Sequence, residues 1–353
     1  MVDTASAPEG VPTRSAADRV AVVVNGNAKG VTEDLVEILD QIVQSGDLFV
    51  SRSLEEGREI ARTIVDRGYP TVLTGGGDGT FTQMVTWVVK SAEELGRPEP
   101  RFGLLRLGTG NALAWVLGAQ NPRGRGVVTD LARLRTEAGS RSLRLLEVEG
   151  TLTPFAGLGI DAVTLHHFNE TKAAFARLPI LRHFATGGIA YATAIIGRAM
   201  PEYLVRPHHH VRIVNEGAPA MRLGVDGQPI GPEIGAGELL YEGPMRMVAV
   251  STIPYWGFGA RIFPFANERE DRFSLRVVDI TTFDVALYIR KIWKGTYRSD
   301  RVHDFLVDRI SIHLETPVPL QIGGDSAGPR TVVHAAMARP VQVVDYYSPP
   351  TVG

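Results

Sequence analysis

Apolar residues in the first part of the chain alternate between short continuous runs and runs with helical spacing. Val20–Val24 contains only Val and Ala, which is typical of a strand buried on both faces of a sheet. In Val31–Val43 apolar positions recur every three or four residues, which predicts an amphipathic helix. The same alternation continues through the predicted strands Thr71–Leu73 and Phe102–Leu107. Repeated strand–helix units of this kind predict a three-layer α/β domain with a mainly parallel sheet.

After about Leu143 the pattern changes to short apolar segments separated by turns rich in Gly, Pro and Asn. The segments that we interpret as strands are Arg212–Asn215, Met221–Val225, Met245–Ser251, Leu275–Ile280 and Ile310–Leu314. Such spacing favours an antiparallel β-sandwich, with a barrel as the alternative. Two predicted helices, Ala162–Arg177 and Phe283–Trp293, interrupt the strands. The expected fold class is therefore an N-terminal α/β domain followed by an all-β domain.

The chain of 353 residues is long enough for two domains. We predict a disordered polar tail at residues 1–17, an α/β domain at 18–142 and a β-sandwich domain at 143–330. The segment 331–353 contains a last strand that could pack back on the first domain. The N-terminus lacks the apolar run of a signal peptide, and no apolar stretch reaches the roughly 18 residues of a spanning helix. We therefore expect a cytoplasmic protein whose membrane contacts, where they occur, are peripheral at the inner face.

The composition removes several functional classes from consideration. Hydrophobic residues make up 44% and charged residues 22%, as in a soluble globular protein. The formal net charge of -2 gives no reason to expect a nucleic-acid partner. The chain has no cysteine, which excludes disulfides, thiolate zinc sites and a cysteine nucleophile.

The most informative segment is Leu73–Thr80, whose sequence LTGGGDGT joins a predicted strand to a predicted helix. In open parallel sheets, ligands bind beyond the carboxyl ends of the strands. Glycines let the backbone approach a phosphate closely, and a helix N-terminus supplies unpaired N–H donors. The residues that we expect to contact a nucleotide here are Gly75, Gly76, Gly77, Asp78, Gly79 and Thr80. Asp78 could hold a phosphate-bound Mg²⁺ or, alternatively, serve only as a helix cap.

A second glycine segment lies one strand–helix unit further on and consists of Gly108, Thr109, Gly110 and Asn111. The Gly-Gly-Asp-Gly-Thr core of the first segment resembles lipid kinases of the diacylglycerol kinase type, NAD kinases and phosphofructokinases. The second segment resembles the Leu-Gly-Thr-Gly-Asn motif of the diacylglycerol kinase catalytic family. It therefore favours that family over the other two, and we expect the backbone of this segment to contact phosphates as well.

The resemblance runs from about Val20 to Tyr346 and implies a two-domain kinase. ATP, with Mg²⁺, would bind to the first domain, where Asn25, Asn27 and Ser53 stand at further nucleotide-contacting positions. Ser53 could equally be only a helix N-cap. The implied acceptor is diacylglycerol or a related lipid that enters the cleft from a membrane surface. A kinase for sphingosine, ceramide or an NAD-like acceptor, and a non-catalytic lipid- or nucleotide-binding protein, are the alternatives.

The family also implies a late carboxylate that accepts the proton of the lipid hydroxyl. Asp325 matches that position, although Gly323 stands where the family has an aspartate. Asp226 is a weaker candidate, because Asp-Gly between two strand-like runs is first a hairpin signal. Asp161 would join Asp78 in a magnesium–water network, unless it merely caps the helix after it. The predicted catalytic residues are therefore Asp325, Asp78 and Asp161.

Three further positions depart from the family pattern. Arg106 replaces a proline and could add positive charge at the site, and Ala112 replaces an aspartate. Arg272 replaces a glycine in an acidic segment that holds a structural magnesium in some bacterial members, so we doubt that this metal site is retained. The basic and aromatic residues of segment 288–301 could lie on a membrane or form a solvated helix face. Edge strands of the second domain could pair in a homodimer.

Overall fold

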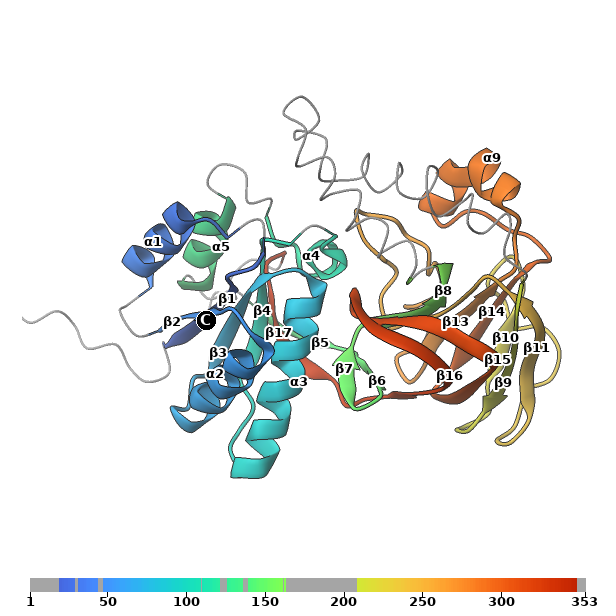
Figure 1. Cartoon of the computed structure of the whole chain (residues 1–353), viewed down its shortest axis with the longest axis horizontal. Helices are drawn as coiled ribbons and strands as arrows, with labels where there is room; N and C mark the ends of the chain where they lie inside the picture. The colour runs from blue at the N-terminus through green and yellow to red at the C-terminus, as the bar shows by residue number, and fades with distance from the viewer. Residues whose placement is uncertain are drawn as a thin grey trace, which may run out of the picture.

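The computed structural model describes residues 19–28, 31–43, 47–108, 110–120, 126–135, 139–160, 162 and 208–347. They form an α/β domain and an all-β domain that lie side by side (Figure 1), and the predicted fold class is confirmed. Thr109 and Asp161 lie outside the described residues, as does the helix expected at Ala162–Arg177 apart from its first residue. No helix of the described part is long and apolar enough to cross a bilayer.

The sheet of the first domain has the strand order β2-β1-β3-β4-β17-β5. Its strands are β1 (Val20–Asn25), β2 (Leu48–Ser51), β3 (Thr71–Gly76), β4 (Arg101–Arg106), β5 (Gly139–Leu143) and β17 (Val341–Asp345). All neighbours in this sheet are parallel except β5, which is antiparallel to β17. Its helices are α1 (Glu33–Ile42), α2 (Leu54–Asp66), α3 (Asp78–Leu95), α4 (Ala112–Leu117) and α5 (Gly126–Arg135). Parallel neighbours need such crossover helices, which explains the alternation in the sequence.

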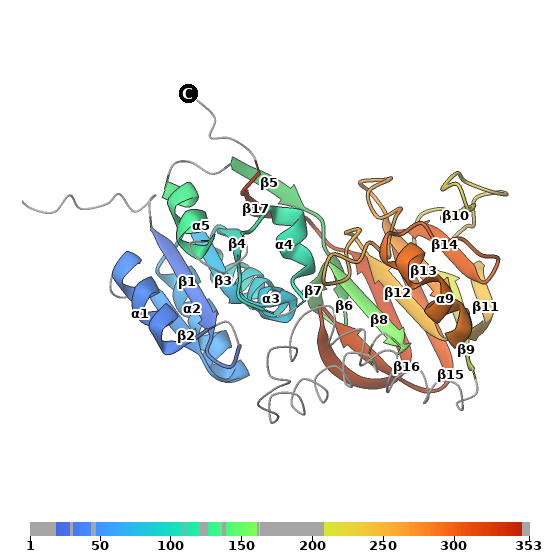
Figure 2. The same ribbon diagram turned by 90° about the horizontal axis from the view of Figure 1, so that it is seen from above.

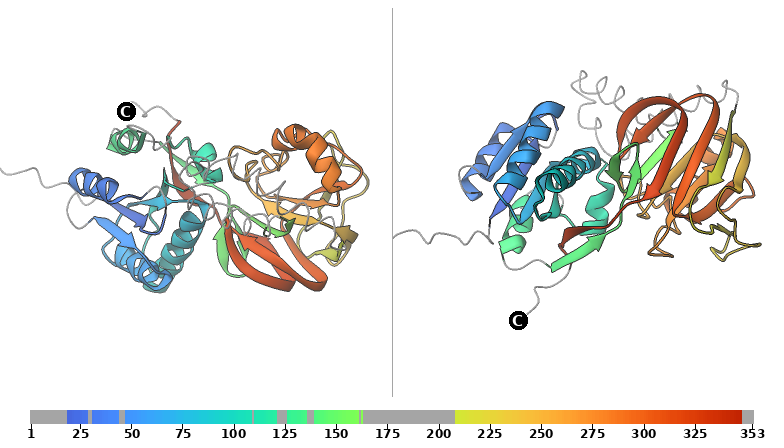
Figure 3. Two further views of the ribbon diagram at one scale, coloured as in Figure 1. Left: turned by 45° about the horizontal axis from the view of Figure 1, so that its top comes forward. Right: turned by 90° about the horizontal axis from the view of Figure 1, so that it is seen from below.

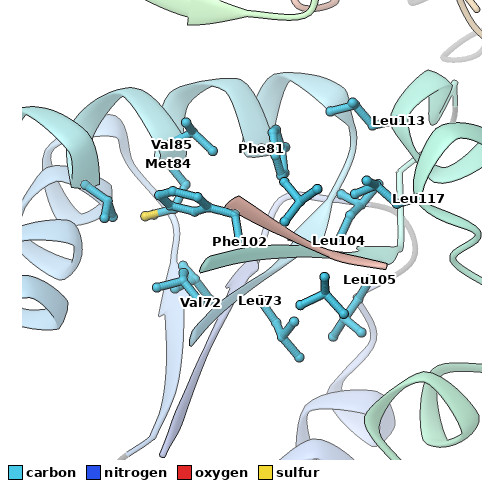
Figure 4. Packing of buried hydrophobic residues seen from close by; sticks show 14 of the residues in the cluster. Val72, Leu73, Phe81, Met84, Val85, Phe102, Leu104, Leu105, Leu113 and Leu117 are labelled. Carbon is cyan, nitrogen blue, oxygen red and sulfur yellow. The ribbon is translucent and has the colours of Figure 1, made fainter. Parts of the chain in front are cut away.

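The core of the first domain includes the space between the sheet and α3. Phe81 and Val85 project from α3 toward the sheet, where the buried Phe102 and Leu104 of β4 lie (Figure 4). The rings of Phe81 and Phe102 meet edge to face, with centroids 6.4 Å apart. Because these side chains are fully buried, they fix α3 against the sheet and so fix the glycine loop that precedes it.

The second domain is an antiparallel sheet in the order β10-β14-β13-β12-β8-β15-β16-β6-β7, with β9 pairing both β11 and β15. Its strands are β6 (Leu146–Val148), β7 (Thr151–Thr153), β8 (Phe155–Gly159), β9 (His209–Asn215), β10 (Met221–Leu223), β11 (Leu239–Met245), β12 (Met247–Ser251), β13 (Phe273–Val278), β14 (Val302–Val307), β15 (Arg309–Ile322) and β16 (Asp325–Met337). Helix α9 (Thr282–Trp293) lies between β13 and β14 in the chain.

The long strand β15 changes partners along its length. Residues Ile310–Leu314 pair with β9, whereas Leu320–Ile322 pair with β8. Its register against β16 shifts between His313 and Val318. Strands that bend and change partners form the corners of β-sandwiches. One continuous sheet can therefore close over a core, as the sandwich expectation requires.

The two domains are joined along α3, which forms the wall of the first domain that faces the second (Figure 2). The backbone N–H of Leu152 in β7 donates to Thr86 Oγ1 of α3 at 2.9 Å. Lys90 Nζ, also on α3, donates to the Gly150 carbonyl at 2.7 Å. Strand β16 continues to Met337, after which the chain returns to the first domain as β17 (Figure 3).

Candidate active site

The two glycine segments meet at the carboxyl ends of β3 and β4. β3 ends at Gly76, and Gly77 is the residue before α3. A Cβ atom on Gly108 would lie only 2.2 Å from Cα of Gly77, so the two backbones touch and leave no room for a side chain. A Cβ atom on Gly76 would lie 2.4 Å from Thr80 Oγ1. Close packing therefore requires glycine at positions 76 and 108. As a result, the N-terminus of α3 lies next to a loop whose backbone is not covered by side chains at these positions.

The carboxylate of Asp78 binds the start of α4. Its two oxygens accept hydrogen bonds from the backbone N–H groups of Ala112 (2.7 Å) and Leu113 (2.9 Å). Burial raises the pKa of Asp78 from 3.8 to about 6, against the opposing effect of these two hydrogen bonds. The nearby negative charge of Asp325 raises the pKa of Asp78 as well. Asp78 is thus a helix cap, but for the helix that follows the second glycine segment and not for its own helix.

Asn111 is the N-cap residue of α4 and has a left-handed backbone, with φ at 50°. Its Nδ2 donates to the Gly108 carbonyl at 2.6 Å, which closes the second glycine segment on itself. Its Oδ1 is buried and finds no hydrogen-bond donor within the described ranges. A buried oxygen without a donor costs about 1–3 kcal/mol. This atom is therefore available to accept a hydrogen bond from a ligand or from a ligand-bound water.

A pocket of about 190 Å³ lies between the ends of β1 and β2 and the side of α3. Its lining includes Asn25, Asn27, Ser53 and Thr80, all of which are predicted nucleotide-contacting residues. Asn25 connects them, because its Nδ2 donates to Thr80 Oγ1 (3.2 Å) and its Oδ1 accepts from the backbone N–H of Asn27 (2.9 Å). Residues that are far apart in the sequence are thus brought together at one pocket.

The side chain of Ser53 has a structural role at this pocket. Its Oγ accepts from the backbone N–H of Glu56 at 3.1 Å and so caps α2. The Glu56 carboxylate returns to the backbone N–H of Arg52, at 2.6 Å. The N-cap interpretation of Ser53 is confirmed, whereas its contact with ATP stays a prediction.

Asp325 is the first residue of β16 and follows a two-residue hairpin turn. Gly323 and Gly324 form the turn with φ values of 59° and 90°, and Ile322 pairs with Asp325 across it. Two consecutive left-handed residues are typical of the turns that glycine favours in tight hairpins. A Cβ atom on Gly323 would also lie 2.4 Å from Thr82 Oγ1 of α3. Glycine at position 323 thus lets the hairpin tip pack closely on α3.

This packing brings the Asp325 carboxylate to the first turn of α3. Gln83 Nε2 donates to Asp325 Oδ2 at 2.9 Å. A Cβ atom on Gly79 would lie 2.4 Å from the same oxygen, so the carboxylate borders the glycine backbone directly. Although Asp325 as a residue is exposed, desolvation of its carboxylate between the domains raises its pKa, and the Gln83 hydrogen bond opposes this. The predicted base and the first glycine segment therefore adjoin one another.

The rival aspartate, Asp226, lies in an exposed turn. Its Oδ1 accepts from the backbone N–H of Gln228 at 3.0 Å, and Gly227 has φ at 81°. The hairpin interpretation of this Asp-Gly pair is confirmed. Sequence reasoning missed Gln83, which touches Asp325. Its helical spacing of four residues from Gly79 is the signal that could have found it, because residues four apart share a helix face.

The contacts of Arg106 and Ala112, two of the departures from the family pattern, show what these residues do in the structure. The Arg106 guanidinium lies 5.2 Å from the ring centroid of Trp115 in α4, in a cation–π arrangement. Trp115 in turn stacks on Tyr255 of the second domain, with centroids 6.2 Å apart. Ala112 is fully buried and supplies the N–H that Asp78 accepts. Both positions thus belong to packing around the second glycine segment.

The loop at Arg272 is organised by a guanidinium from the linker between the domains. Arg144 follows β5 and donates to the backbone carbonyls of Ala266, Arg269 and Arg272 and to Oδ1 of Asn267. The Asp271 carboxylate is bound by the side chains of Arg269 and Arg272. The described residues contain no group of three or more His, Cys, Asp or Glu side chains that could hold a metal ion.

Residues 19–140 match the family model of the diacylglycerol kinase catalytic domain. The predicted family resemblance is confirmed. The matched segment covers the parallel strands β1 to β4, both glycine segments and the pocket.

A curated relative and two crystal structures are also similar to this chain. Over 103 residues the chain is 33% identical to the "Probable lipid kinase YegS-like" protein of Pseudomonas aeruginosa, a match that spans 29% of this chain and 32% of that protein. A diacylglycerol kinase structure from Bacillus anthracis str. Sterne has a TM-score of 0.57 at 13% identity and covers 94% of this chain and 97% of its own. A second structure from that organism, provisionally named a diacylglycerol kinase, has a TM-score of 0.62 at 15% identity, with 94% and 98% covered. These structures share the two-domain fold.

Proposed function

We propose that this protein is an ATP-dependent lipid kinase that transfers the γ-phosphate of Mg·ATP to a hydroxyl of diacylglycerol or a related lipid. The observation that carries the proposal is the contact between Asp325 of the second domain and the first turn of α3. A Cβ atom on Gly79 would lie 2.4 Å from Asp325 Oδ2, so a carboxylate borders the phosphate-binding loop. An acceptor that enters between the domains would therefore meet both the Asp325 carboxylate and the phosphates bound at this loop.

The nucleotide would lie along the first domain. Its phosphates would contact the backbone of the two glycine segments at the N-terminus of α3, where unpaired N–H groups favour anions. The rest of the nucleotide, its ribose and base, would extend toward the pocket at Asn25, Asn27 and Ser53. The carboxyl ends of parallel strands are the usual place for such ligands, which supports this orientation.

Magnesium that arrives with ATP would meet the oxygens of Asp78 and Asn111. Each Asp78 oxygen already accepts one N–H, and each keeps a further lone pair. The unpaired Oδ1 of Asn111 adds a second acceptor. This set fits water molecules of a hydrated Mg²⁺ better than direct ligation, since Mg²⁺ keeps several waters in such sites. When bound, the ion would neutralise phosphate charge, and Asp161 stays a prediction from the sequence.

The proposed chemistry needs one proton acceptor. The lipid hydroxyl oxygen attacks the γ-phosphorus, a new P–O bond forms, and the bond to the β–γ bridging oxygen breaks to release ADP. The hydroxyl proton moves to the Asp325 carboxylate, whose raised pKa makes it a stronger base than a free aspartate. Gln83 holds that carboxylate by its hydrogen bond and so orients it toward the phosphate loop.

A direct test is transfer of radiolabelled γ-phosphate from Mg·ATP to diacylglycerol, monoacylglycerol, sphingosine and ceramide in mixed micelles. We expect labelled lipid from wild type and a loss of about 10²–10⁴-fold in kcat for Asp325→Asn, the usual contribution of a general base. Asp226→Asn is the matched control, because Asp226 lies in an exposed turn away from the site, and its activity should equal wild type.

The outcomes separate the candidate functions. Label in a single lipid class would name the acceptor. NAD is assayed as a separate, soluble acceptor, and label transferred only to NAD would replace the lipid acceptor by a dinucleotide. A folded, ATP-binding protein that labels nothing would contradict the kinase and favour a binding role. We further propose that the enzyme works from the cytoplasm at the inner face of the membrane, where its acceptor resides.

A further inference from the structure

Helix α9 has one face that the described residues of the second domain leave exposed. Phe283 and Leu287 are 73% and 60% exposed, although both are large apolar side chains. Arg290, Lys291 and Lys294 are also exposed and continue the same face at helical spacing. The outer face of α9 therefore begins with two apolar side chains and ends with three basic ones.

The opposite face anchors α9 firmly to the second domain. Ile292 and Trp293 pack against a buried cluster that includes Ala260 and Phe263. The backbone N–H of Arg261 donates to the Trp293 carbonyl at 2.8 Å. Thr281 and Asp284 form a capping box at its first turn. The exposure of Phe283 and Leu287 is thus a property of a well-anchored helix, and packing within the described part of the chain does not account for these two residues.

The loop that holds α9 also reaches the candidate active site. In this loop, Phe258 donates its backbone N–H to the Gly110 carbonyl of the second glycine segment at 2.9 Å. Tyr255 stacks on Trp115, which is 41% exposed, and the Arg261 guanidinium lies 5.7 Å from the Tyr255 ring centroid. In Figure 1, α9 lies at the top of the second domain, and α4 lies lower, on the side of the first domain that faces the second.

We propose that α9 docks the protein on an anionic lipid bilayer. Phe283 and Leu287 enter the boundary between headgroups and acyl chains, and Arg290, Lys291 and Lys294 lie against lipid phosphates. Amphipathic helices with aromatic or leucine side chains on one side and basic residues beside them bind membranes in this way. The binding goes beyond catalysis, because it requires neither ATP nor an acceptor lipid.

Charge complementarity and size favour a bilayer over a protein partner. The one acidic residue of this helix, Asp284, hydrogen-bonds Thr281 at the first turn. The basic Arg290, Lys291 and Lys294 outnumber it, so the outer face keeps a net positive charge. Two exposed apolar side chains make a patch far below the roughly 800 Å² per partner of a stable protein interface. Shallow insertion into a bilayer needs only such a small patch, because lipid phosphates supply the remaining attraction.

Vesicle sedimentation tests the proposal without any kinase assay. The full chain is mixed with vesicles of phosphatidylglycerol and phosphatidylcholine, or of phosphatidylcholine alone. We expect strong binding only to the anionic vesicles, and weakening by about tenfold or more in Phe283→Ser/Leu287→Ser. Lys291→Ala/Lys294→Ala should weaken binding about 30-fold, since each basic residue near the surface contributes about fivefold. Added salt should weaken the wild type but change the charge variant less.

Matched controls come from the first domain. Val128 of α5 is 41% exposed, and the Arg62 side chain of α2 is 63% exposed, so Val128→Ser and Arg62→Ala remove comparable groups elsewhere. Both controls should bind vesicles as wild type does. Vesicle binding of the α9 variants equal to that of wild type would overturn the proposal. A lower oligomer mass after replacement of Phe283 and Leu287 would also overturn it, because this face would then join copies of the protein. Vesicle binding by a protein that phosphorylates no lipid would support α9 docking and contradict only the kinase proposal.

Discussion

Asp78 and Arg144 hold loops by the same physical means but with opposite charge. The Asp78 carboxylate accepts from two backbone N–H groups at the start of α4. The Arg144 guanidinium donates to three backbone carbonyls in the loop 266–272. Asp78 works within the first domain, whereas Arg144 fastens the linker between the domains to the second. In both, one charged side chain satisfies backbone groups of a segment far away in the sequence.

The electrostatic surroundings of the two groups differ. Glu270 and Asp271 favour the charged form of Arg144 and so oppose the lowering of its pKa by burial. Within the described residues the Asp78 carboxylate is bound by backbone N–H groups, and the charge of Asp325, which also raises its pKa, has the same sign. An ionised Asp78 thus lies beside the first glycine segment without a cationic side chain among its described partners, whereas Arg144 is balanced by nearby carboxylates. This difference indicates a structural role for Arg144 and leaves Asp78 suited to a cation that arrives with the nucleotide.

The substitution Asp78→Ala should lower both kinase activity and stability. We expect kinase activity to fall by about 10²–10³-fold, since both the second glycine segment and the charge near the phosphates are lost. The free energy of unfolding should fall by about 2 kcal/mol, because two N–H groups of α4 lose their acceptor. Phosphate transfer and urea unfolding measure the two effects. Undiminished kinase activity would contradict any role of Asp78 in the reaction.

Replacement of Arg144 should affect stability more than catalysis. Arg144→Ala leaves the carbonyls of the loop 266–272 without their donor and should lower the free energy of unfolding by about 2 kcal/mol. Arg144→Lys should recover less than half of this, because an ammonium group cannot match the planar fork of a guanidinium. Urea unfolding followed by tryptophan fluorescence gives the energies. ATP affinity should stay unchanged, because the nucleotide pocket lies in the other domain, and a large loss of ATP affinity would contradict the structural assignment.

A feature could be predicted from the sequence when its cause lies within a short segment of the chain. The buried run Val20–Val24 and the glycine segment Leu73–Thr80 carry their own signals, so the strands, the crossover helices and the glycine loop before α3 were predictable. The acidic residue Asp325 was found only through a family resemblance, because its approach to α3 depends on a hairpin that folds across the domain boundary. Nothing within a short window of sequence contains that information.

The partners of charged residues were the least predictable features. The sequence marks Asp78 as a metal ligand or a helix cap, but it does not say that the capped helix begins at Ala112. Arg144 looks like one arginine among many until the loop 266–272 folds around it. The exposure of Phe283 was equally hidden, because helical periodicity alone assigns an apolar residue to the core. Such contacts join distant segments, and only the tertiary fold determines them.

The dependence of stability on pH separates the two charged groups most cleanly. Asp78 has a pKa of about 6 when folded and 3.8 as its ordinary value, so between these pH values the native state binds more protons than the unfolded state. The free energy of unfolding should therefore fall as pH rises from about 4 to about 6, by up to about 3 kcal/mol from this group. Burial also raises the pKa of Asp130 to about 6, which adds a fall of the same sign. In Asp78→Asn the contribution of Asp78 should be lost while those of Asp130 and Asp325 remain. Arg144→Lys should keep the full slope, because both arginine and lysine stay charged in this range. Urea unfolding at several pH values gives the slopes, and equal slopes for wild type and Asp78→Asn would show that the Asp78 carboxylate is not buried as described.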